Sequence, residues 1–344
     1  MKLLKFAAIL FATCLSLLLV AAFAVAGPPN GYHLKKKVQL ESAPGALEYF
    51  DYLTFDAPSR RVYISHGTEV IVVDADSDKI VGTITGLKRC HGIAIVDELN
   101  EGFITDGEAG QVAVFDTNTL KITGNIKTAP DADAIIYDPA SKLVFSFNGD
   151  SKNASVIDPA KKTLVKNVPL GGGPEFAVAD GKGMIYNNME DKNEVVAIDS
   201  HALAVKARWP VAPAGGPTAI AMDRDHRRLF SAGREPQMLI MMDADRGTVL
   251  QSFPISSGAD AAVFDSSEVF VSTREGKVHI FHEDSPDNLS EEETVQTEYG
   301  AKTMALDPKT HDIYVTTADF NPPSGAKKRR EPVPGTFRLL IYSR

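Results

Sequence analysis

Six charged residues near the start of short apolar runs carry side chains that could do chemistry. They are one imidazole, four carboxylates and one ammonium, namely His91, Asp131, Asp133, Glu175, Asp260 and Lys302. Carboxylate oxygens can hold a divalent metal ion, and a histidine flanked by carboxylates can act as a general acid or base. A third interpretation needs no reaction, because such residues also line hydrated ligand-binding surfaces. We favour this third interpretation and predict no resident cofactor, with a bound divalent metal as the alternative.

Cys90 directly precedes His91 and suggests a nucleophile beside a base. Neighbours in an extended segment point to opposite sides of the strand, so these two side chains should not meet. We therefore expect Cys90 to be structural. The glycines at 171–173 lack the Lys and Ser/Thr of a phosphate loop, and the chain contains neither a C-x-x-C-H haem motif nor a G-x-S-x-G sequence. We predict no catalytic residue.

The segments that must position these residues repeat about every 42 residues. In each unit an apolar run ends in an aspartate, and a turn and a second β-rich run follow. Each unit holds about four runs rich in Val, Ile, Phe and Tyr, which indicate strands, and a period of this length with four strands is typical of a β-propeller. We expect the repeated aspartates to cap turns. They are Asp56, Asp97, Asp138, Asp180, Asp223, Asp265 and Asp307.

The two ends of the chain indicate how the ring closes. The seventh unit holds only three strands before the chain stops at Arg344, and one extra strand, around Lys35–Leu40, precedes the first unit. Pairing the extra strand into the last unit would complete it and hide exposed sheet edges. We therefore predict an all-β fold, a seven-bladed β-propeller closed by an N-terminal strand in the last blade and formed by residues 27–344 as a single domain.

In such a ring the six charged residues fall at one mouth of the central channel, which is the default ligand-binding place. The loops that follow the second strands of the blades open on the same face. We expect these outer loops to carry polar residues, namely His66, Asp106, Glu108, Asn148, Asp150, Asn187, Asn188, Glu190, Arg234, Glu235, Arg274 and Glu275. A calcium ion at the channel would need convergent oxygen ligands, for which Asn148, Asn187 and Asp260 are the candidates.

Two segments interrupt the repeat and are expected to be loops. Residues 283–293 form an acidic insertion beyond the third strand of the sixth unit. Residues 320–336 form a second insertion on the channel-mouth face of the seventh unit, with prolines around a basic tract. A positive tract on an acidic protein can recruit an anionic partner, so this loop is a candidate partner-binding segment. The tract is Lys327, Lys328, Arg329 and Arg330.

The second strands of the units carry a family resemblance. They include VYISHG at 62–67, VFVSTREG at 269–276 and IYVTTAD at 313–319, and the turns GGGPEFAVA and AGGPTAIAM precede two inner strands. These motifs resemble the YVTN-repeat, YncE-like family of seven-bladed propellers over the whole of residues 27–344. The resemblance implies an exported or surface propeller without an assigned reaction. It transfers no functional residue, because no functional motif is shared.

The first 26 residues have the pattern of a secretory signal peptide. Lys2 and Lys5 precede an apolar run, and Ala24-Val25-Ala26 provides the cleavage pattern. Export would leave 34 basic and 45 acidic residues, a net charge of −11, with Cys90 as the one remaining cysteine. Such a charge makes binding of duplex DNA improbable, and the exported chain would contain no membrane span. We expect a periplasmic or secreted protein.

Together these features predict an exported β-propeller that acts as a non-catalytic binding or scaffold protein of the cell envelope. Its partner would be an envelope protein, a polymer or a small molecule. Two alternatives keep a chemical role for the channel. One is a metal-dependent hydrolase of the lactonase kind, and the other is a periplasmic redox accessory in which His91 ligates a non-covalent cofactor.

Overall fold

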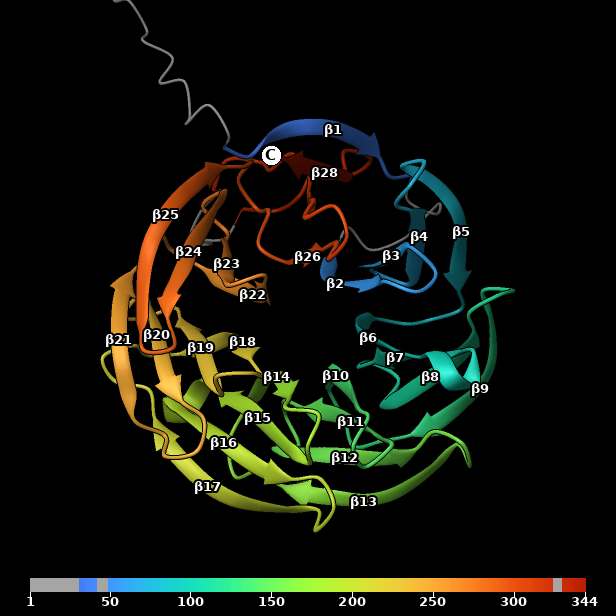
Figure 1. Cartoon of the computed structure of the whole chain (residues 1–344). Coiled ribbons are helices and arrows are strands. Elements are labelled where there is room, and N and C mark those ends of the chain that lie inside the picture. The colour runs from blue at the N-terminus through green and yellow to red at the C-terminus, as the bar shows by residue number, and fades with distance from the viewer. Residues whose placement is uncertain (1–30, 42–48, 324–329) are drawn as a thin grey trace, which may run out of the picture.

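The chain is described by a computed structural model that covers residues 31–41, 49–323 and 330–344. These residues form seven four-stranded antiparallel sheets arranged in a ring (Figure 1). The seven-bladed β-propeller predicted from the repeat is therefore confirmed. The segment 1–26, predicted as a signal peptide, lies outside the described residues. Among the described residues, no helix is long and apolar enough to cross a membrane.

In each of the first three blades, the four strands follow one another in chain order from the central channel to the perimeter (Figure 1). In blade one they are β2 (Phe50–Asp56), β3 (Arg61–His66), β4 (Glu69–Asp74) and β5 (Lys79–Thr85). In blade two they are β6 (Cys90–Val96), β7 (Glu101–Asp106), β8 (Gln111–Asp116) and β9 (Lys121–Lys127). In blade three they are β10 (Ala132–Asp138), β11 (Leu143–Asn148), β12 (Asn153–Asp158) and β13 (Thr163–Pro169).

Blades four to six follow the same order. Blade four holds β14 (Pro174–Ala179), β15 (Met184–Met189), β16 (Glu194–Asp199) and β17 (Ala204–Pro210). Blade five holds β18 (Pro217–Asp223), β19 (Arg228–Gly233), β20 (Met238–Asp243) and β21 (Val249–Pro254). Blade six holds β22 (Ala259–Asp265), β23 (Glu268–Thr273), β24 (Lys277–Ser285) and β25 (Asn288–Gln296). Two short 3₁₀ turns, Asp97–Leu99 and Glu190–Lys192, lie between strands.

Blade seven combines both ends of the chain. Its inner three strands are β26 (Met304–Leu306), β27 (Ile313–Thr317) and β28 (Arg338–Ser343), and its outer strand is β1 (His33–Gln39). β1 pairs with β28 antiparallel, from His33 opposite Ser343 to Gln39 opposite Arg338. The predicted closure by the N-terminal strand is therefore confirmed.

Burial follows from the position of a strand in its blade. The second and third strands are apolar on both faces, because each sheet packs between two neighbouring sheets, and in β3 and β7 every residue after the first is buried. The fourth strands line the perimeter and are mostly exposed, with alternation between exposed and less exposed residues in β9 and β21. The sequence pattern and the layered packing between the blades therefore agree.

Four of the seven repeated aspartates cap the turns after the inner strands as predicted, namely Asp138, Asp180, Asp223 and Asp307. Asp265 instead pairs with His311. The carboxylate of Asp138 accepts hydrogen bonds from the amide and the hydroxyl of Ser141 at 3.0 and 2.7 Å. In blade seven, Asp307 accepts a hydrogen bond from the amide of Lys309 at 2.9 Å. These carboxylates satisfy turn amides, which is the usual use of aspartate at this position.

The acidic insertion is not a loop, contrary to the expectation for residues 283–293. It belongs to β24 and β25, which extend to nine residues each and pair until Ser285 faces Asn288. Leu289 and Val295 are buried while the acidic residues between them mostly face solvent. This alternation is that of a half-buried strand. The second insertion does lie between β27 and β28, where Phe320 bridges to Pro332.

Candidate functional site

A β-bulge at the start of the inner strand shapes the channel mouth in six of the seven blades. In blade one the register between β2 and β3 shifts between Phe50 and Leu53, and in blade two it shifts between Cys90 and Ile93. Equivalent shifts occur in blades three to six. A bulge interrupts pairing and re-aims side chains, and five of the six bulges contain a charged residue, with Thr218 at the equivalent place in blade five.

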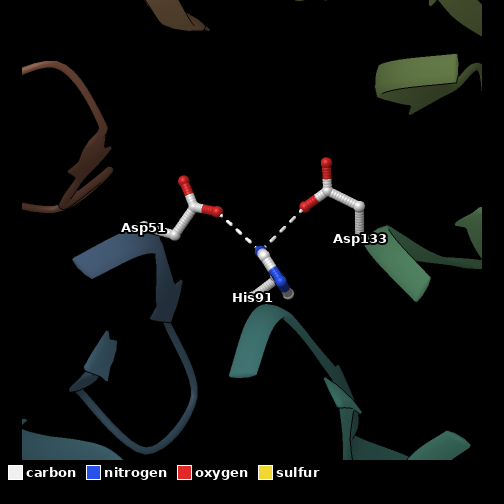
Figure 2. A group of neighbouring side chains, drawn as sticks. All are labelled: Asp51, His91 and Asp133. Atoms are coloured by element: carbon white, nitrogen blue, oxygen red, sulfur yellow. Dashed lines mark hydrogen bonds and ion pairs between the residues drawn. The ribbon is translucent and has the colours of Figure 1, made fainter. Parts of the chain in front are cut away.

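His91 lies between two carboxylates contributed by the neighbouring blades (Figure 2). Its Nδ1 atom is 2.9 Å from Oδ2 of Asp51 and 3.2 Å from Oδ1 of Asp133. The hydroxyl of Tyr49 also donates to Oδ2 of Asp51, at 2.7 Å. Asp51 and His91 are buried, and Asp133 is half-buried. Three consecutive blades thus meet at one imidazole.

The two carboxylates keep this imidazole charged. Burial lowers the pKa of His91, but hydrogen bonding and charge attraction from Asp133 and Asp51 outweigh it and raise the pKa to about 9. His91 is therefore an imidazolium at neutral pH, and a protonated imidazole cannot accept a proton as a general base.

A chain of ion pairs continues from Asp51 around the ring. The ammonium of Lys302 lies 3.1 Å from Oδ1 of Asp51 and also pairs with Asp260. Arg234 in turn pairs with Asp260 and, at 3.0 Å, with Glu190. Burial favours the neutral form of Asp51, yet Lys302 and His91 hold its pKa well below the usual range. Blades one, two, three, six and seven contribute to the network from their inner strands or the turns leading into them.

The negative charges of Asp133 and Glu175 are less well balanced by neighbouring cations than that of Asp51. Burial raises the pKa of both carboxyls, and their mutual repulsion adds to the shift at Glu175, whose pKa lies well above the usual range. Arg234 opposes the shift at Glu175, but its guanidinium pairs with Asp260 and Glu190. Neighbouring blades three and four therefore present two carboxyl groups whose charge the protein balances poorly.

Aromatic packing connects opposite sides of the channel. Tyr52 of blade one and Phe176 of blade four stack with ring centroids 4.4 Å apart. Each ring directly follows a carboxylate of the mouth in sequence, Asp51 or Glu175. Burial and the surrounding carboxylates raise the pKa of Tyr52 well above its usual value, so its hydroxyl stays protonated.

Four of the six predicted residues, His91, Asp133, Asp260 and Lys302, belong to one network, which Asp51 joins together. Glu175 lies within electrostatic reach of this network. Asp131 belongs to none of the ion pairs named above. Its carboxylate accepts the amide of Asp150 at 3.2 Å, and its charge helps to raise the pKa of Asp133.

Asp51 was missed by the sequence reasoning, although it is the centre of the network. The signal that could have found it is its position five residues before the repeated Asp56, the same offset that separates Asp260 from Asp265 and Lys302 from Asp307. Comparing this single position across the seven units would have identified Asp51, Asp133, Glu175, Asp260 and Lys302 together, whereas His91 lies six residues before Asp97.

Five of the polar residues expected on the outer loops are instead fully buried at the ends of second strands. This corrects the expectation for His66, Asp106, Asn148, Asn187 and Asn188. Asn148 donates to Oδ1 of Asn153 at 2.7 Å, and Asn187 donates to the carbonyl of Glu175 at 2.8 Å. These amides hold loops and adjoining strands in place, as buried polar groups must find partners.

Cys90 behaves as the structural residue expected. Its Sγ atom donates to the carbonyl of Glu69 at 3.0 Å, and burial raises the pKa of the thiol to about 12. A thiol with this pKa is not a nucleophile at neutral pH. In the basic tract, Lys327, Lys328 and Arg329 lie outside the described residues, and Arg330 packs over the Tyr299 ring.

Three groups of side chains in the described residues have the spacing that a metal ion needs. The first is the channel group in Figure 2. The other two lie on either side of β24, and each combines one histidine with two carboxylates. They are Asp223 with His226 and Glu283, and Glu268 with His282 and Glu292.

Comparisons with known proteins support the fold alone. No protein-family model and no curated protein matches the chain. Hydrazine synthase from Kuenenia stuttgartiensis aligns with a TM-score of 0.70 at 14% identity, over 81% of this chain and 94% of that chain. A structure of U3-55K aligns with a TM-score of 0.73 at 8% identity, over 89% and 98%. At such low sequence identity, structural similarity gives no information about activity. The similarity of this chain to both structures therefore concerns the β-propeller fold alone.

Proposed function

We propose that this chain is an exported propeller of the YVTN-repeat, YncE-like kind, acting as a non-catalytic binding or scaffold protein of the cell envelope. Its ligand contacts the mouth of the central channel. The observation that carries the proposal is the state of His91, whose Nδ1 atom lies 2.9 and 3.2 Å from the carboxylates of Asp51 and Asp133. The residue best suited to acid–base chemistry is thereby held as a charged, paired group.

The same network supports a binding role. The side chains of Asp51, Lys302 and Asp260 fix one another through ion pairs, so they need little reorganisation when a ligand arrives. Such preorganisation lowers the entropic cost of binding. Asp133 and Glu175 provide carboxyl groups that the protein balances poorly. A small molecule with an amine or another hydrogen-bond donor would complement them.

A hydrolase of the lactonase kind is the second candidate, and the channel group of Figure 2 is the observation that favours it. A metal there would have to displace the proton on Nδ1 of His91 and compete with Lys302 for Asp51. These contacts make the binding role the better supported of the two.

The envelope location is supported by the sequence. The leader pattern of residues 1–26 and the net charge of −11 that would remain after its removal fit an exported acidic protein. They also disfavour non-specific binding to nucleic acid, which needs a positive surface.

Mass spectrometry of the native, unchelated protein tests the proposal. We expect a retained small molecule or a ligand-dependent rise in thermal midpoint that is lost in Asp133→Asn and Glu175→Gln. The matched control is Glu108→Gln, which changes an exposed carboxylate near the end of β7 and should leave binding unchanged. Lactone or ester hydrolysis that disappears in His91→Gln would instead establish an enzyme.

A further inference from the structure

A separate group of titratable side chains lies on the face of the ring opposite the channel mouth, at the junction of blades five and six. Asp223 ends the inner strand β18, and His226 follows in the next turn. Glu283 comes from β24 of the neighbouring blade. Glu283 belongs to the acidic insertion that interrupts the repeat, and the channel network does not use it.

These side chains converge on one imidazole nitrogen. Nδ1 of His226 lies 2.6 Å from Oδ2 of Asp223 and 3.5 Å from Oε2 of Glu283. The Asp223 carboxylate is fixed by its turn, since Oδ1 accepts the amide of Asp225 at 2.9 Å. His226 is half-exposed, with 48% of its side chain accessible, so the group can be reached from solvent.

Glu283 has a buried oxygen that the protein leaves without a partner. Its side chain is only 2% exposed, and its Oε1 atom is buried with no hydrogen bond. A buried carboxylate without partners is costly. Asp223 and Glu283 approach the same imidazole nitrogen, so the two carboxylates repel each other inside the protein.

In the neighbouring group on the other side of β24, an arginine balances the negative charge of two carboxylates. Glu268 pairs there with the guanidinium of Arg344, which also lies 3.6 Å from Glu292. His282, adjacent to Glu283 in the strand, faces that side. For Asp223 and Glu283 the nearest described positive group is His226, which supplies one charge for two carboxylates.

We propose that Asp223, His226 and Glu283 bind a divalent transition-metal ion such as zinc. Two carboxylates and one neutral imidazole match the charge of such an ion and belong to the ligand types that zinc prefers. Tetrahedral bonds of about 2.0–2.1 Å place ligand atoms about 3.3 Å apart. The 3.5 Å separation already fits, and the 2.6 Å hydrogen bond lengthens when its proton leaves Nδ1.

The metal would join the turn of blade five to the long hairpin of blade six. The exposed side of His226 leaves room for water as the fourth ligand, so the site has an open position. This assignment also explains the acidic insertion, because the lengthened β24 brings the Glu283 carboxylate to His226 in the blade-five turn. The site is independent of the channel mouth.

Isothermal titration of the EDTA-stripped protein with Zn²⁺ tests the assignment, with Co²⁺ absorption as the report on geometry. We expect one equivalent to bind with micromolar or tighter affinity, and Glu283→Gln and His226→Gln to weaken binding at least tenfold. Glu283→Gln removes a repulsive buried charge, so its metal-free thermal midpoint should equal or exceed that of the wild type. A loss of binding in this variant therefore cannot be blamed on unfolding.

His311→Gln is the matched control, because Nδ1 of His311 lies 2.6 Å from Asp265 but belongs to none of the three-residue groups among the described residues. His282→Gln reports on the neighbouring group. The assignment is overturned if the wild type binds Zn²⁺ more weakly than about 100 µM. It is equally overturned if Glu283→Gln and His226→Gln keep wild-type affinity for Zn²⁺. The same holds if His311→Gln or His282→Gln loses as much Zn²⁺ affinity as Glu283→Gln and His226→Gln do.

Discussion

At the scale of residues, the channel mouth depends on charge balance around His91. The imidazole would be neutral near physiological pH if it were isolated, yet Asp51 and Asp133 hold it in the charged form. Its proton is therefore part of the structure of the mouth, which links protein stability to pH.

The pH dependence follows from the sign of the shift. The pKa of His91 rises from 6.5 in the unfolded chain to about 9 in the folded protein, so its stabilising contribution is complete below pH 6.5 and is lost as the pH rises through 9. The shift corresponds to about 3 kcal/mol at most. Thermal midpoints of the wild type and His91→Gln between pH 6 and 10 measure it. If the thermal midpoint of the wild type falls with rising pH no more steeply than that of His91→Gln, the raised pKa assigned to His91 is wrong.

At the scale of elements, the turns after the inner strands join neighbouring blades. Arg60, in the turn between β2 and β3, reaches the carboxylate of Asp307 in blade seven with two contacts of 2.5 and 2.6 Å. Arg227 pairs with Asp180 between blades five and four at 3.1 Å. Two-pronged arginine–carboxylate pairs are among the stronger polar contacts in proteins.

Breaking the Arg60 pair should destabilise the ring. Burial favours neutral Asp307, but Arg60 and the turn amides bring its pKa down to about 2. Arg60→Met would leave a fully buried carboxylate without this cation, at a cost of about 3 kcal/mol or more. Urea unfolding measures this loss. In the wild type, the contribution of the pair should be complete above pH 3.8 and should be lost as the pH falls from there through about 2.

Lys142→Met is the control for the Arg60 experiment. Lys142 occupies the same turn in blade three, also with a positive φ, but it is exposed. Its replacement should change stability by less than about 0.5 kcal/mol. Equal effects of the two substitutions would show that the turn conformation, not the ion pair, is what matters.

At the scale of the whole molecule, stability depends on closure of the ring. Leu40, directly after β1, is fully buried in a cluster that combines residues of blades one and seven, including Val62 and Leu339. Its amide donates to the carbonyl of Phe337 at 3.0 Å. The closing N-terminal strand therefore anchors itself in the apolar cluster between the first and last blades through Leu40.

Leu40→Ala should lower the free energy of unfolding by about 2–5 kcal/mol, because it opens a cavity at this junction. Leu34→Ala on the same segment removes a side chain that is 39% exposed and should cost far less. Chemical denaturation of both variants checks the difference. Equal, small losses would mean that the closing strand contributes little to the stability of the ring.

Much of this architecture could be predicted from the sequence. The spacing of the repeated aspartates and the alternation of apolar residues gave the blade number, the strands and the closing strand, because a repeated local pattern encodes a repeated local structure. The acidic insertion was harder to place. Its strand character depends on Leu289 and Val295 packing inward among residues whose charge is typical of a loop.

The candidate site could be predicted only in part. Composition and position in the repeat identified His91, Asp133, Asp260 and Lys302, since each lies near the start of an inner strand. Their partners come from other blades, tens to hundreds of residues away, and the sequence contains no signal for such pairs. The bulges that turn these side chains are equally absent from the apolar pattern.

The sequence by itself thus determined the ring and its polar centre, since both follow from local periodicity. Only the tertiary structure decided which charges meet: Asp51 with His91, Lys302 with Asp260, and Glu283 with Asp223 and His226. The physical reason is that pairing energies depend on distance and burial. Both are set by how the blades pack against one another.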